Sequence, residues 1–485
     1  MYLGPYTVYL GPYTVYLGPC TVHLGPYTVN LMPEIIHIGG EHTVTGSCHL
    51  MKTHDLHIMV DCGLAQGADH VAPISAWPVR PAAIDYLFLT HAHIDHIGRL
   101  PELIAHGFKG EIICTHPTKA LLAPMLQDAL TFSEFEKNAA KQILQTIDDL
   151  AWGFEYHQTF KLQKGIEFKL GCAGHILGSC FIRFTIPGYA PQSPEQNSFS
   201  IIFSGDLGAK DTPILPDPDP PDSCDLLLLE STYGDRLHED RTLRIERLGN
   251  ILTHALADKG KVFIPAFSLG RTQELLYELD RLFAQKAWRD RAKQSNRWPV
   301  PVFVDSPLGL KITEIYSALS EYWDKEAKTL YSDGDHPIDF DHLYSIARYR
   351  EHKQLLKIPG PAIIIAGSGM CTGGRIIDHL EEGLEERRND IFFVGYQAEG
   401  TLGRDIIRYS RHTDGYVRLA GRKIPIKAKV RTLSGYSAHA DQQGLIDWVE
   451  SMPGKPGAIK LVHGEPQAQK ILAEKLRLRD FKIRG

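Results

Sequence analysis

Short apolar segments separated by turn residues predict that the first half of the chain is rich in β-strands. From residue 34 the sequence alternates or runs apolar for a few residues at a time, with Gly and polar residues between the runs. The predicted strands cover residues 34–38, 49–52, 56–60, 86–90, 167–170, 181–186, 200–203 and 226–229. One long helix is predicted over residues 120–145.

The pattern changes near residue 260, where predicted strands and helices begin to alternate. This stretch contains strands at 261–266, 302–305, 362–366 and 390–394, and helices at 271–288, 312–323 and 375–388. Alternating strands and helices predict a parallel sheet covered by helices. The chain then continues with a strand at 430–433, a helix at 441–452, a strand at 459–462 and a helix at 466–479. This order predicts an α/β protein whose outer domain is discontinuous and contains an inserted α/β domain.

Composition limits the class of protein. The chain has 485 residues, enough for two or three domains, and a net charge of −6. Any polyanion must therefore be held by a local basic groove or by metals, because the whole chain is not basic. We expect a cytoplasmic protein with reduced thiols and no membrane contact. The eight cysteines form no Cys-x-x-Cys pair, no signal peptide is visible, and no apolar run approaches about 18 residues.

Residues 1–31 contain four copies of a seven-residue repeat, beginning YLGPYTV. Gly-Pro in every copy excludes a continuous helix, because proline lacks the amide hydrogen and clashes with the preceding turn. We expect this tail to be disordered or loosely extended. A normal domain start follows Met32, so we also expect that the native protein begins there.

Four residues of the types that bind metal ions fall within six positions directly after the predicted strand 86–90. They are His91, His93, Asp95 and His96. Imidazole and carboxylate are the usual ligands of catalytic zinc. The spacing would let His91 and His93 reach one ion while Asp95 and His96 reach a second. A solvated, His-rich turn is the alternative interpretation, which the density of ligand types disfavours.

Other candidate residues also follow predicted strands, directly or within a few positions. They are Asp61, His175, Asp206, Glu230, His439 and His463. The carboxyl ends of strands are where α/β proteins place their binding and catalytic groups.

This ordered series of His and Asp residues resembles the metallo-β-lactamase superfamily. Three later elements resemble motifs of the β-CASP nucleases within it: Glu230 after four leucines, Ser437-Ala-His439-Ala-Asp441, and Leu461-Val-His463-Gly-Glu465. The segments at 265–274 and 367–375 are also typical of the β-CASP insert. The resemblance covers residues 34–485 and is strongest to compact prokaryotic members related to the messenger-RNA 3′-processing endonuclease.

The resemblance implies a fold and a metal site. The fold is an αββα metallo-β-lactamase sandwich formed by residues 32–225 and 425–485, with a β-CASP domain inserted over residues 226–424. Two Zn²⁺ ions are implied, with Mn²⁺ as a substitute that such ligands accept. His91, His93 and His175 would hold the first ion, Asp95, His96 and His463 the second, and Asp206 would bridge them. Asp61 would orient the ligand loop through hydrogen bonds.

The resemblance also implies hydrolysis of RNA phosphodiester bonds by two-metal catalysis, in RNA processing or decay, leaving 5′-phosphate and 3′-hydroxyl ends. Glu230 and His439 would form an acid pair that protonates the leaving 3′-oxygen. His463 favours RNA, because DNA-directed relatives tend to have valine there. The expected contacts to backbone phosphates come from two arginines and from Gly-rich turns, for which a simple tight turn is an equal interpretation. These residues are Arg271, Arg375, Ser368, Gly369, Ser434 and Gly435.

Several alternatives stay open. The protein could be a small-molecule hydrolase acting on an ester, thioester or lactam, a DNA-directed β-CASP nuclease, or an inactive binding subunit. The long insert favours a nuclease, because it can roof the metals and shape a groove for a polymer. Inactive relatives have lost ligands, and none is missing here. The sequence does not decide the preferred RNA, the balance of endonuclease and exonuclease activity, or whether the chain forms a homodimer.

Overall fold

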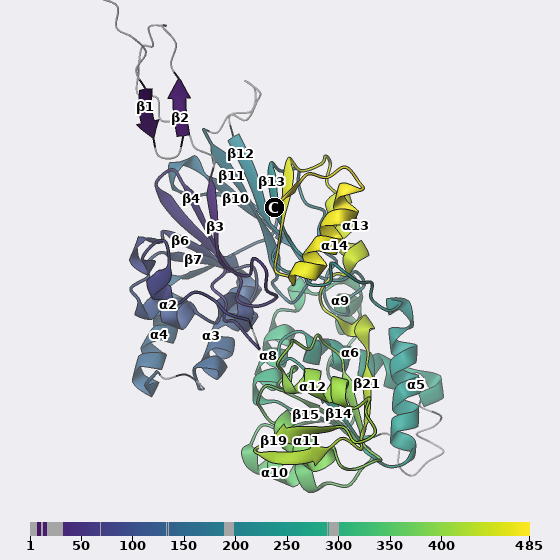
Figure 1. Cartoon of the computed structure of the whole chain (residues 1–485). Helices are drawn as coiled ribbons and strands as arrows, with labels where there is room; N and C mark the ends of the chain where they lie inside the picture. Colours follow the sequence, from purple (N-terminus) through teal and green to yellow (C-terminus); the bar gives the residue numbers. More distant parts are fainter. Residues whose placement is uncertain are drawn as a thin grey trace, which may run out of the picture.

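The computed structural model describes residues 7–10, 13–16, 33–67, 69–131, 133, 135–188, 198–288, 290 and 300–485. Two domains stacked along the long axis of the molecule make up most of this part (Figure 1). None of its helices is both long and apolar enough to cross a membrane. Within the N-terminal repeat, β1 (Thr7–Leu10) and β2 (Tyr13–Tyr16) pair antiparallel, and the other residues of that predicted tail lie outside the described part.

The outer domain contains two sheets packed face to face. The strands of the first sheet are β3 (Glu34–Gly39), β4 (Cys48–Thr53), β5 (Leu56–Val60), β6 (Tyr86–Phe88), β7 (Glu111–Thr115) and β8 (Ala151–Phe154), in that order. The second sheet has the order β23-β22-β13-β12-β11-β10-β9. Its strands are β9 (Thr159–Lys161), β10 (Glu167–Cys172), β11 (Cys180–Pro187), β12 (Ser198–Phe203), β13 (Leu226–Glu230), β22 (Ala458–Val462) and β23 (Ile483–Arg484).

The run of four leucines in β13 shows how this sandwich is built. Successive residues of a strand point to opposite faces of the sheet. Leu226 and Leu228 therefore pack between the two sheets, whereas Leu227 and Leu229 pack against the helices outside. The uninterrupted apolar run is explained by burial on both faces.

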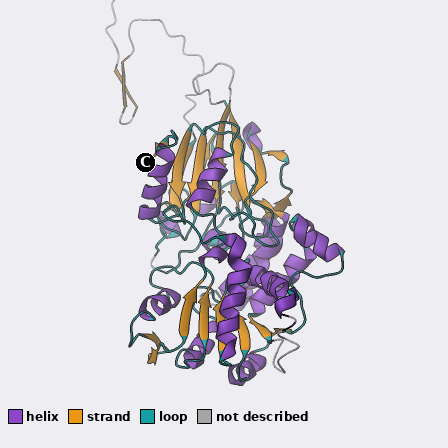
Figure 2. Ribbon diagram, turned by 90° about the vertical axis from the view of Figure 1, so that its right-hand side faces the viewer, coloured by secondary structure: helices purple, strands orange, loops and turns teal. Residues whose placement is uncertain are grey.

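Helices cover the outer face of each sheet, as Figure 2 shows. The first sheet is covered by α1 (Ile94–Ile97), α2 (Leu100–Ala105), α3 (His116–Leu130) and α4 (Lys137–Leu150), and the second by α13 (Gln442–Glu450) and α14 (Pro466–Arg477). The predicted αββα sandwich is thereby confirmed.

The inserted domain contains a six-stranded parallel sheet with helices on both faces, as predicted. Its strand order is β16-β15-β17-β14-β18-β21. The strands are β14 (Lys261–Pro265), β15 (Val302–Asp305), β16 (Leu343–Ser345), β17 (Ala362–Ala366), β18 (Asp390–Phe393) and β21 (Lys429–Thr432). The helices are α5 (Arg244–Ala257), α6 (Arg271–Ala284), α8 (Pro307–Ala318), α9 (Lys325–Ser332), α10 (Tyr349–Lys357), α11 (Ile376–Gly383) and α12 (Leu402–Tyr409). A hairpin of β19 (Tyr416–Leu419) and β20 (Arg422–Pro425) packs against α12.

The predicted boundaries of the insert, residues 226 and 424, both differ from those that the strand pairing gives. Strand β13 pairs with β12 and β22 in the outer domain, and β21 pairs with β18 in the inserted sheet. The insertion thus runs from after Glu230 to about Leu433. Both strands are short, β13 being apolar and β21 mostly polar, and the sequence alone does not say which sheet each one joins.

The single helix predicted over residues 120–145 is wrong, because the structure has two helices there. Helix α3 ends at Leu130 and α4 begins at Lys137. Where α3 ends, polar side chains form hydrogen bonds with the backbone carbonyls of its last turn. The Thr131 and Ser133 hydroxyls donate to the carbonyls of Asp128 and Leu130, at 2.6 and 2.8 Å. Such local bonds compete with helix continuation.

Candidate metal centre and active site

The ligand-type side chains lie together at one end of the two outer sheets. Each follows a strand or sits in an adjoining loop: Asp61 after β5, His91, His93, Asp95 and His96 after β6, His175 between β10 and β11, Asp206 after β12, Glu230 at the end of β13 and His463 after β22. Strands β12, β13 and β22 run parallel, so their carboxyl ends meet at one edge of the sheet.

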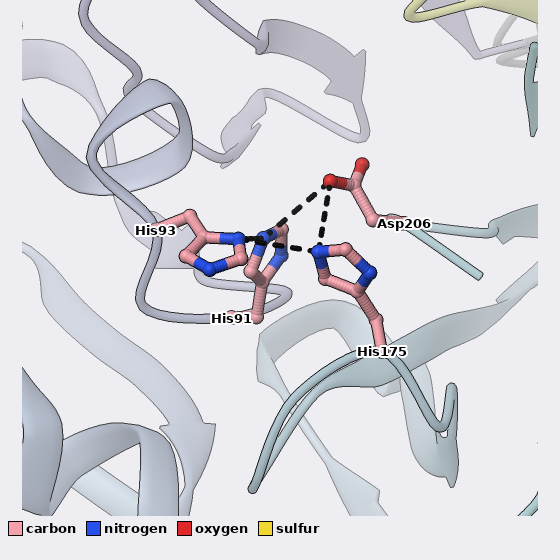
Figure 3. A group of neighbouring side chains, drawn as sticks. All are labelled: His91, His93, His175 and Asp206. Carbon is pink, nitrogen blue, oxygen red and sulfur yellow. Dashed lines mark hydrogen bonds and ion pairs between the residues drawn. The ribbon is translucent and has the colours of Figure 1, made fainter. Parts of the chain in front are cut away.

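Four of these side chains direct one donor atom each toward a common point (Figure 3). His93 Nδ1 lies 3.1 Å from His91 Nε2 and 3.2 Å from His175 Nε2. Asp206 Oδ2 lies 3.5 and 3.6 Å from the same two Nε2 atoms. Donors around a tetrahedral zinc ion, with bonds of about 2.0–2.1 Å, are about 3.3 Å apart. The four atoms therefore have the mutual spacing of ligands on one ion.

A second group of donors lies on the other side of Asp206. His96 Nε2 and His463 Nε2 are 3.1 Å apart, and Asp95 Oδ2 lies 3.7 and 3.6 Å from them. Asp206 Oδ1 lies 3.3 and 3.5 Å from the same two nitrogens. Asp206 thus presents one carboxylate oxygen to each group, and the structure brings together all seven ligand residues expected from the sequence.

The electrostatics of these groups fit divalent cations. Burial holds the pKa values of His91, His93 and His175 below the ordinary histidine value, so the rings are neutral and keep a lone pair for a metal. Asp206 Oδ1 is buried and accepts no hydrogen bond from the described residues. Burial disfavours the charged ring of His96, but the carboxylates of Asp206, Asp61 and Asp95 outweigh it and raise its pKa. Bound cations would compensate the charge of the carboxylates gathered here.

Asp61 holds the ligand loop in place and does not itself join either group of donors. Its Oδ2 accepts a hydrogen bond from His96 Nδ1 at 2.7 Å, which leaves His96 Nε2 free. Its Oδ1 accepts from the Thr90 amide at 2.8 Å. Asp61 is 2 % exposed and adopts a φ of 59°, a left-handed conformation that Asp tolerates better than most residues.

His439 and Glu230 form a pair beside Asp206. His439 Nδ1 donates to Glu230 Oε1 at 3.2 Å, and His439 Nε2 lies 3.9 Å from Asp206 Oδ2. Glu230 is fully buried and also accepts from the amides of Leu207 and Thr232. Burial works against the charged ring of His439, but the carboxylates of Glu230 and Asp206 raise its pKa to about 9. These two carboxylates thus favour the protonated form of the ring.

Backbone contacts fix the loop that carries His439. Gly208 and His439 form an antiparallel bridge, and the Ala440 amide donates to Leu207 at 2.7 Å. Arg241, near the start of the insertion, donates to the carbonyls of Gly435 and Ser437, both at 2.9 Å. The first segment of the insertion is thus tied to the segment that returns to the outer domain, next to the site.

A cleft of about 460 Å³ opens above the two groups of donors. The outer domain contributes His93, Asp95, His175 and Asp206 to its floor. The inserted domain forms the opposite wall, which includes Phe267, Arg271, Ser368, Met370 and Tyr396. The candidate catalytic groups thus lie at the interface between the domains, where ligand sites commonly occur.

Three of the predicted phosphate contacts line this cleft, namely Arg271, Ser368 and Gly369. Arg271 is 5 % exposed and forms an ion pair with Glu274. A side chain at Gly369 would collide with the ring of Phe267, because an added Cβ would lie 2.6 Å from it. Close packing on Phe267 therefore accounts for this glycine without a phosphate.

The other predicted phosphate contacts are not brought to the cleft. Arg375 donates to Asp305 Oδ1 at 2.7 Å and to the carbonyls of Ile346 and Ala347, so its guanidinium is engaged within the inserted domain. Gly435 lies against Glu239 and Arg244, outside the cleft lining. The side chain of Ser434 lies outside the described part of the chain.

Sequence reasoning missed the residues that position the ligands. Thr90 Oγ1 lies 3.1 Å from His91 Nδ1, and Thr232 Oγ1 lies 3.2 Å from His463 Nδ1. Both threonines lie close to predicted site residues, directly before His91 and two positions after Glu230, which is the one signal that could have indicated them. Arg241 has no such signal, because its partners are almost two hundred positions away in the sequence.

Comparison with protein families matches three segments of the chain. Residues 43–160 match the metallo-beta-lactamase superfamily, and residues 272–406 match the Beta-Casp domain. Residues 423–484 match a Zn-dependent metallo-hydrolase RNA specificity domain.

Individual relatives match over most of the chain. The chain is 34% identical to Ribonuclease TTHA0252 of Thermus thermophilus over 446 residues, 92% of this chain and 96% of that one. It is 29% identical to the transcription termination factor FttA of Methanocaldococcus jannaschii, covering 88% of this chain and 66% of the relative. It is 28% identical to the cleavage and polyadenylation specificity factor 73 of Drosophila melanogaster, covering 88% of this chain and 59% of the relative. A crystal structure of a protein of unknown function from Enterococcus faecalis V583 shares the fold, with a TM-score of 0.51 and 12% identity over 90% of this chain and 95% of that one.

Proposed function

The chain belongs to the β-CASP family of the metallo-β-lactamase superfamily, and from this premise we propose that it is a metal-dependent ribonuclease that hydrolyses RNA phosphodiester bonds. Relatives of this chain are named as a ribonuclease and an endoribonuclease. The proposed products carry a 5′-phosphate and a free 3′-hydroxyl.

One observation carries the proposal. Asp206 presents its two oxygens to two separate groups of donors, and the His439–Glu230 pair lies beside it at the floor of the interdomain cleft. Phosphodiester hydrolysis needs charge stabilisation on two oxygens of an in-line displacement and a proton for the leaving one. This arrangement supplies both at one place.

The proposed cofactor is a pair of Zn²⁺ ions, with Mn²⁺ as an alternative. His91, His93, His175 and Asp206 would hold one, and Asp95, His96, His463 and Asp206 the other. Two such cations would lower the pKa of a shared water and stabilise the charge that develops on the phosphate. Zinc is favoured because imidazole nitrogens supply three of the four donors of the first group and two of the four of the second, and the spacing of the first group is tetrahedral.

The proposed roles of the remaining residues follow from their atoms. His439 Nδ1 is occupied by Glu230, so Nε2 is the atom that would give its proton to the leaving 3′-oxygen. Glu230 would keep the ring charged and oriented. Asp61 would hold His96 in the tautomer whose Nε2 binds metal.

The inserted domain favours a polymer over a small ester, thioester or lactam, because it forms one entire wall of the cleft. RNA is preferred to DNA because His463 completes the second group of donors, and DNA-directed members tend to have valine there. A cytoplasmic location and a homodimer stay predictions.

The decisive experiment incubates the purified protein with end-labelled RNA, single-stranded DNA and a chromogenic ester, with and without chelator. We expect chelator-sensitive cleavage of RNA only, with 5′-phosphate ends on the products. Asp206→Asn is the matched inactive variant, since it keeps the side-chain shape and loses the charge. Turnover of the ester without cleavage of RNA would favour the small-molecule hydrolase, and cleavage of DNA alone would favour the DNA-directed nuclease.

A further inference from the structure

One segment of the inserted domain is strongly basic although the whole chain is acidic. The net charge of the chain is −6, yet residues 401–431 contain nine Lys or Arg and only two acidic residues. The basic residues are Arg404, Arg408, Arg411, Arg418, Arg422, Lys423, Lys427, Lys429 and Arg431. This segment comprises α12, the β19–β20 hairpin and β21. Such a local excess is the electrostatic signature of a surface that binds a polyanion.

Helix α12 leads from the cleft to the hairpin. At its beginning, the Gly403 amide donates to the carbonyl of Met370, a residue of the cleft wall. Arg404 and Arg408 are exposed and four positions apart, so they lie on one face of the helix. Arg411 is exposed in the turn that follows. Eight helical residues span about 12 Å, and Figure 1 shows β19 farther from the outer domain than α12.

The hairpin continues the basic surface and carries an unfavourable charge pair. Arg418 and Lys423 are directly opposite each other across β19 and β20, and both are exposed. Like charges in this position destabilise a hairpin. Val417 and Ile424, on its other face, are buried and hold it to the domain. Burial of Val417 and Ile424 thus holds the hairpin in place although the Arg418–Lys423 pair destabilises it.

Five of the nine cations of this segment are neutralised by neighbours. Ion pairs join Arg404, Arg422, Lys427, Lys429 and Arg431 to Glu399, Glu381, Glu385, Asp258 and Asp390, respectively. By contrast, none of the carboxylates in the described ranges is within ion-pair distance of Arg408, Arg411, Arg418 or Lys423. These four cations are available to an external anion.

Exposed tyrosines lie among these cations. Tyr409 is 36% exposed, with the Arg408 guanidinium 5.7 Å from its ring centroid. Tyr416 is 40% exposed, with Lys423 Nζ 4.0 Å from its ring centroid. Aromatic rings between cations are the surface that single-stranded nucleic acids use, because bases stack on the rings while the cations contact phosphates.

We propose that Arg408, Arg411, Arg418, Lys423 and Tyr416 form an accessory surface that binds single-stranded RNA extending from the cleft. This inference rests on the proposed ribonuclease function and adds a binding site for the part of the RNA that lies outside the cleft. The surface should therefore distinguish long RNA from a trinucleotide, because a long strand has further nucleotides outside the cleft to contact it.

The test uses a variant with Arg408→Gln, Arg411→Gln, Arg418→Gln and Lys423→Gln. Its control removes four exposed lysines elsewhere, with Lys137→Gln, Lys141→Gln, Lys164→Gln and Lys475→Gln. Both carry the same change of net charge. Cleavage of a long single-stranded RNA and of a trinucleotide is measured, giving KM and kcat for each. Binding of the long RNA is measured by fluorescence anisotropy in a His439→Ala background, as a function of salt.

We expect the surface variant to raise KM for the long RNA by about tenfold or more, with the loss confined to that substrate. Four lost phosphate contacts should also make the dependence of log affinity on log salt shallower by about 3, since each contributes about 0.7 on a single strand. The control should match the unmodified protein. Equal KM values and equal salt slopes in the variant and the control would overturn the inference.

The outcomes also separate this inference from the proposed function. If the unmodified protein cuts no RNA, the proposed function fails, and the anisotropy data alone decide the accessory surface. If the variant loses binding to single-stranded DNA or to phosphatidylglycerol vesicles while its RNA binding is unchanged, the surface serves another anion and the inference is wrong.

Discussion

Replacing His439 with alanine tests which residue supplies the proton to the leaving group. In the structure Glu230 occupies Nδ1 of this ring, and Nε2 lies near Asp206. A positioned acid contributes about 10²–10⁴-fold to the rate, equal to about 3–5 kcal/mol of transition-state stabilisation. We expect kcat on RNA to fall by this amount. Both metals should stay bound, because His439 belongs to neither of the two groups of donors that Asp206 joins.

The assay compares two substrates that differ in their leaving groups. The 3′-oxygen of RNA needs a proton to leave, whereas p-nitrophenolate does not. We expect His439→Ala to lose activity on RNA and to keep most of its activity on bis(p-nitrophenyl) phosphate, with metal content measured by plasma mass spectrometry. His106→Ala, a change at an exposed histidine, is the control. Equal losses on both substrates, or full activity on RNA, would refute the role as acid.

The His439–Glu230 pair should make the rate of RNA cleavage depend on pH. Burial alone would discharge His439, but Glu230 and Asp206 raise its pKa to about 9, so the acid form is present below that pH and is lost above it. Divalent cations beside the ring would bring this pKa down. We therefore expect kcat on RNA to decline as the pH rises through a value at or below about 9, and we expect His439→Ala to lack this decline.

Four further changes have distinct expected effects. Asp206→Ala removes a donor from both groups, so elemental analysis should find fewer than two metals per chain and RNA cleavage should be absent. Asp61→Asn removes the charge that holds His96, and zinc affinity, measured by chelator competition, should fall about 10–100-fold. Arg241→Met leaves the carbonyls of Gly435 and Ser437 without their donor, and urea unfolding should show a loss of about 1–3 kcal/mol. Leu228→Ala opens a void between the sheets and should cost about 2–5 kcal/mol, whereas Leu478→Ala, at a position 80% exposed, should change the stability by less than about 0.5 kcal/mol.

The fold class and the positions of the ligand residues could be predicted because both depend on short-range pattern. Each ligand follows a brief apolar strand, and parallel strands bring their carboxyl ends to one edge. His91, Asp206 and His463 are far apart in the sequence, yet each is marked locally by the strand before it. In the structure a carboxylate oxygen of Asp206 lies 3.5 Å from His91 Nε2, and its other oxygen lies 3.5 Å from His463 Nε2.

What could not be predicted depends on partners distant in sequence. Nothing near Arg375 indicates that Asp305 and two carbonyls engage its guanidinium, so an arginine in a Gly-rich segment resembled a phosphate contact. The sheet to which β13 belongs is decided by its pairing with β22, more than two hundred positions later. Patterns of apolar residues indicate that a strand exists and leave its neighbours undetermined.

The position of the two chain crossings bears on how a substrate enters. The chain leaves the outer domain just after Glu230 and returns just before His439, and these two residues are hydrogen-bonded to each other. Arg241 fastens the outgoing segment to the returning one, so both crossings are held together. The inserted domain is attached to the outer domain a second time, where α8 packs against α3 and the Leu177 amide donates to the Tyr316 hydroxyl at 3.2 Å. With two attachments the walls of the cleft are held at a set separation, and a substrate enters through the opening that the fold leaves between them.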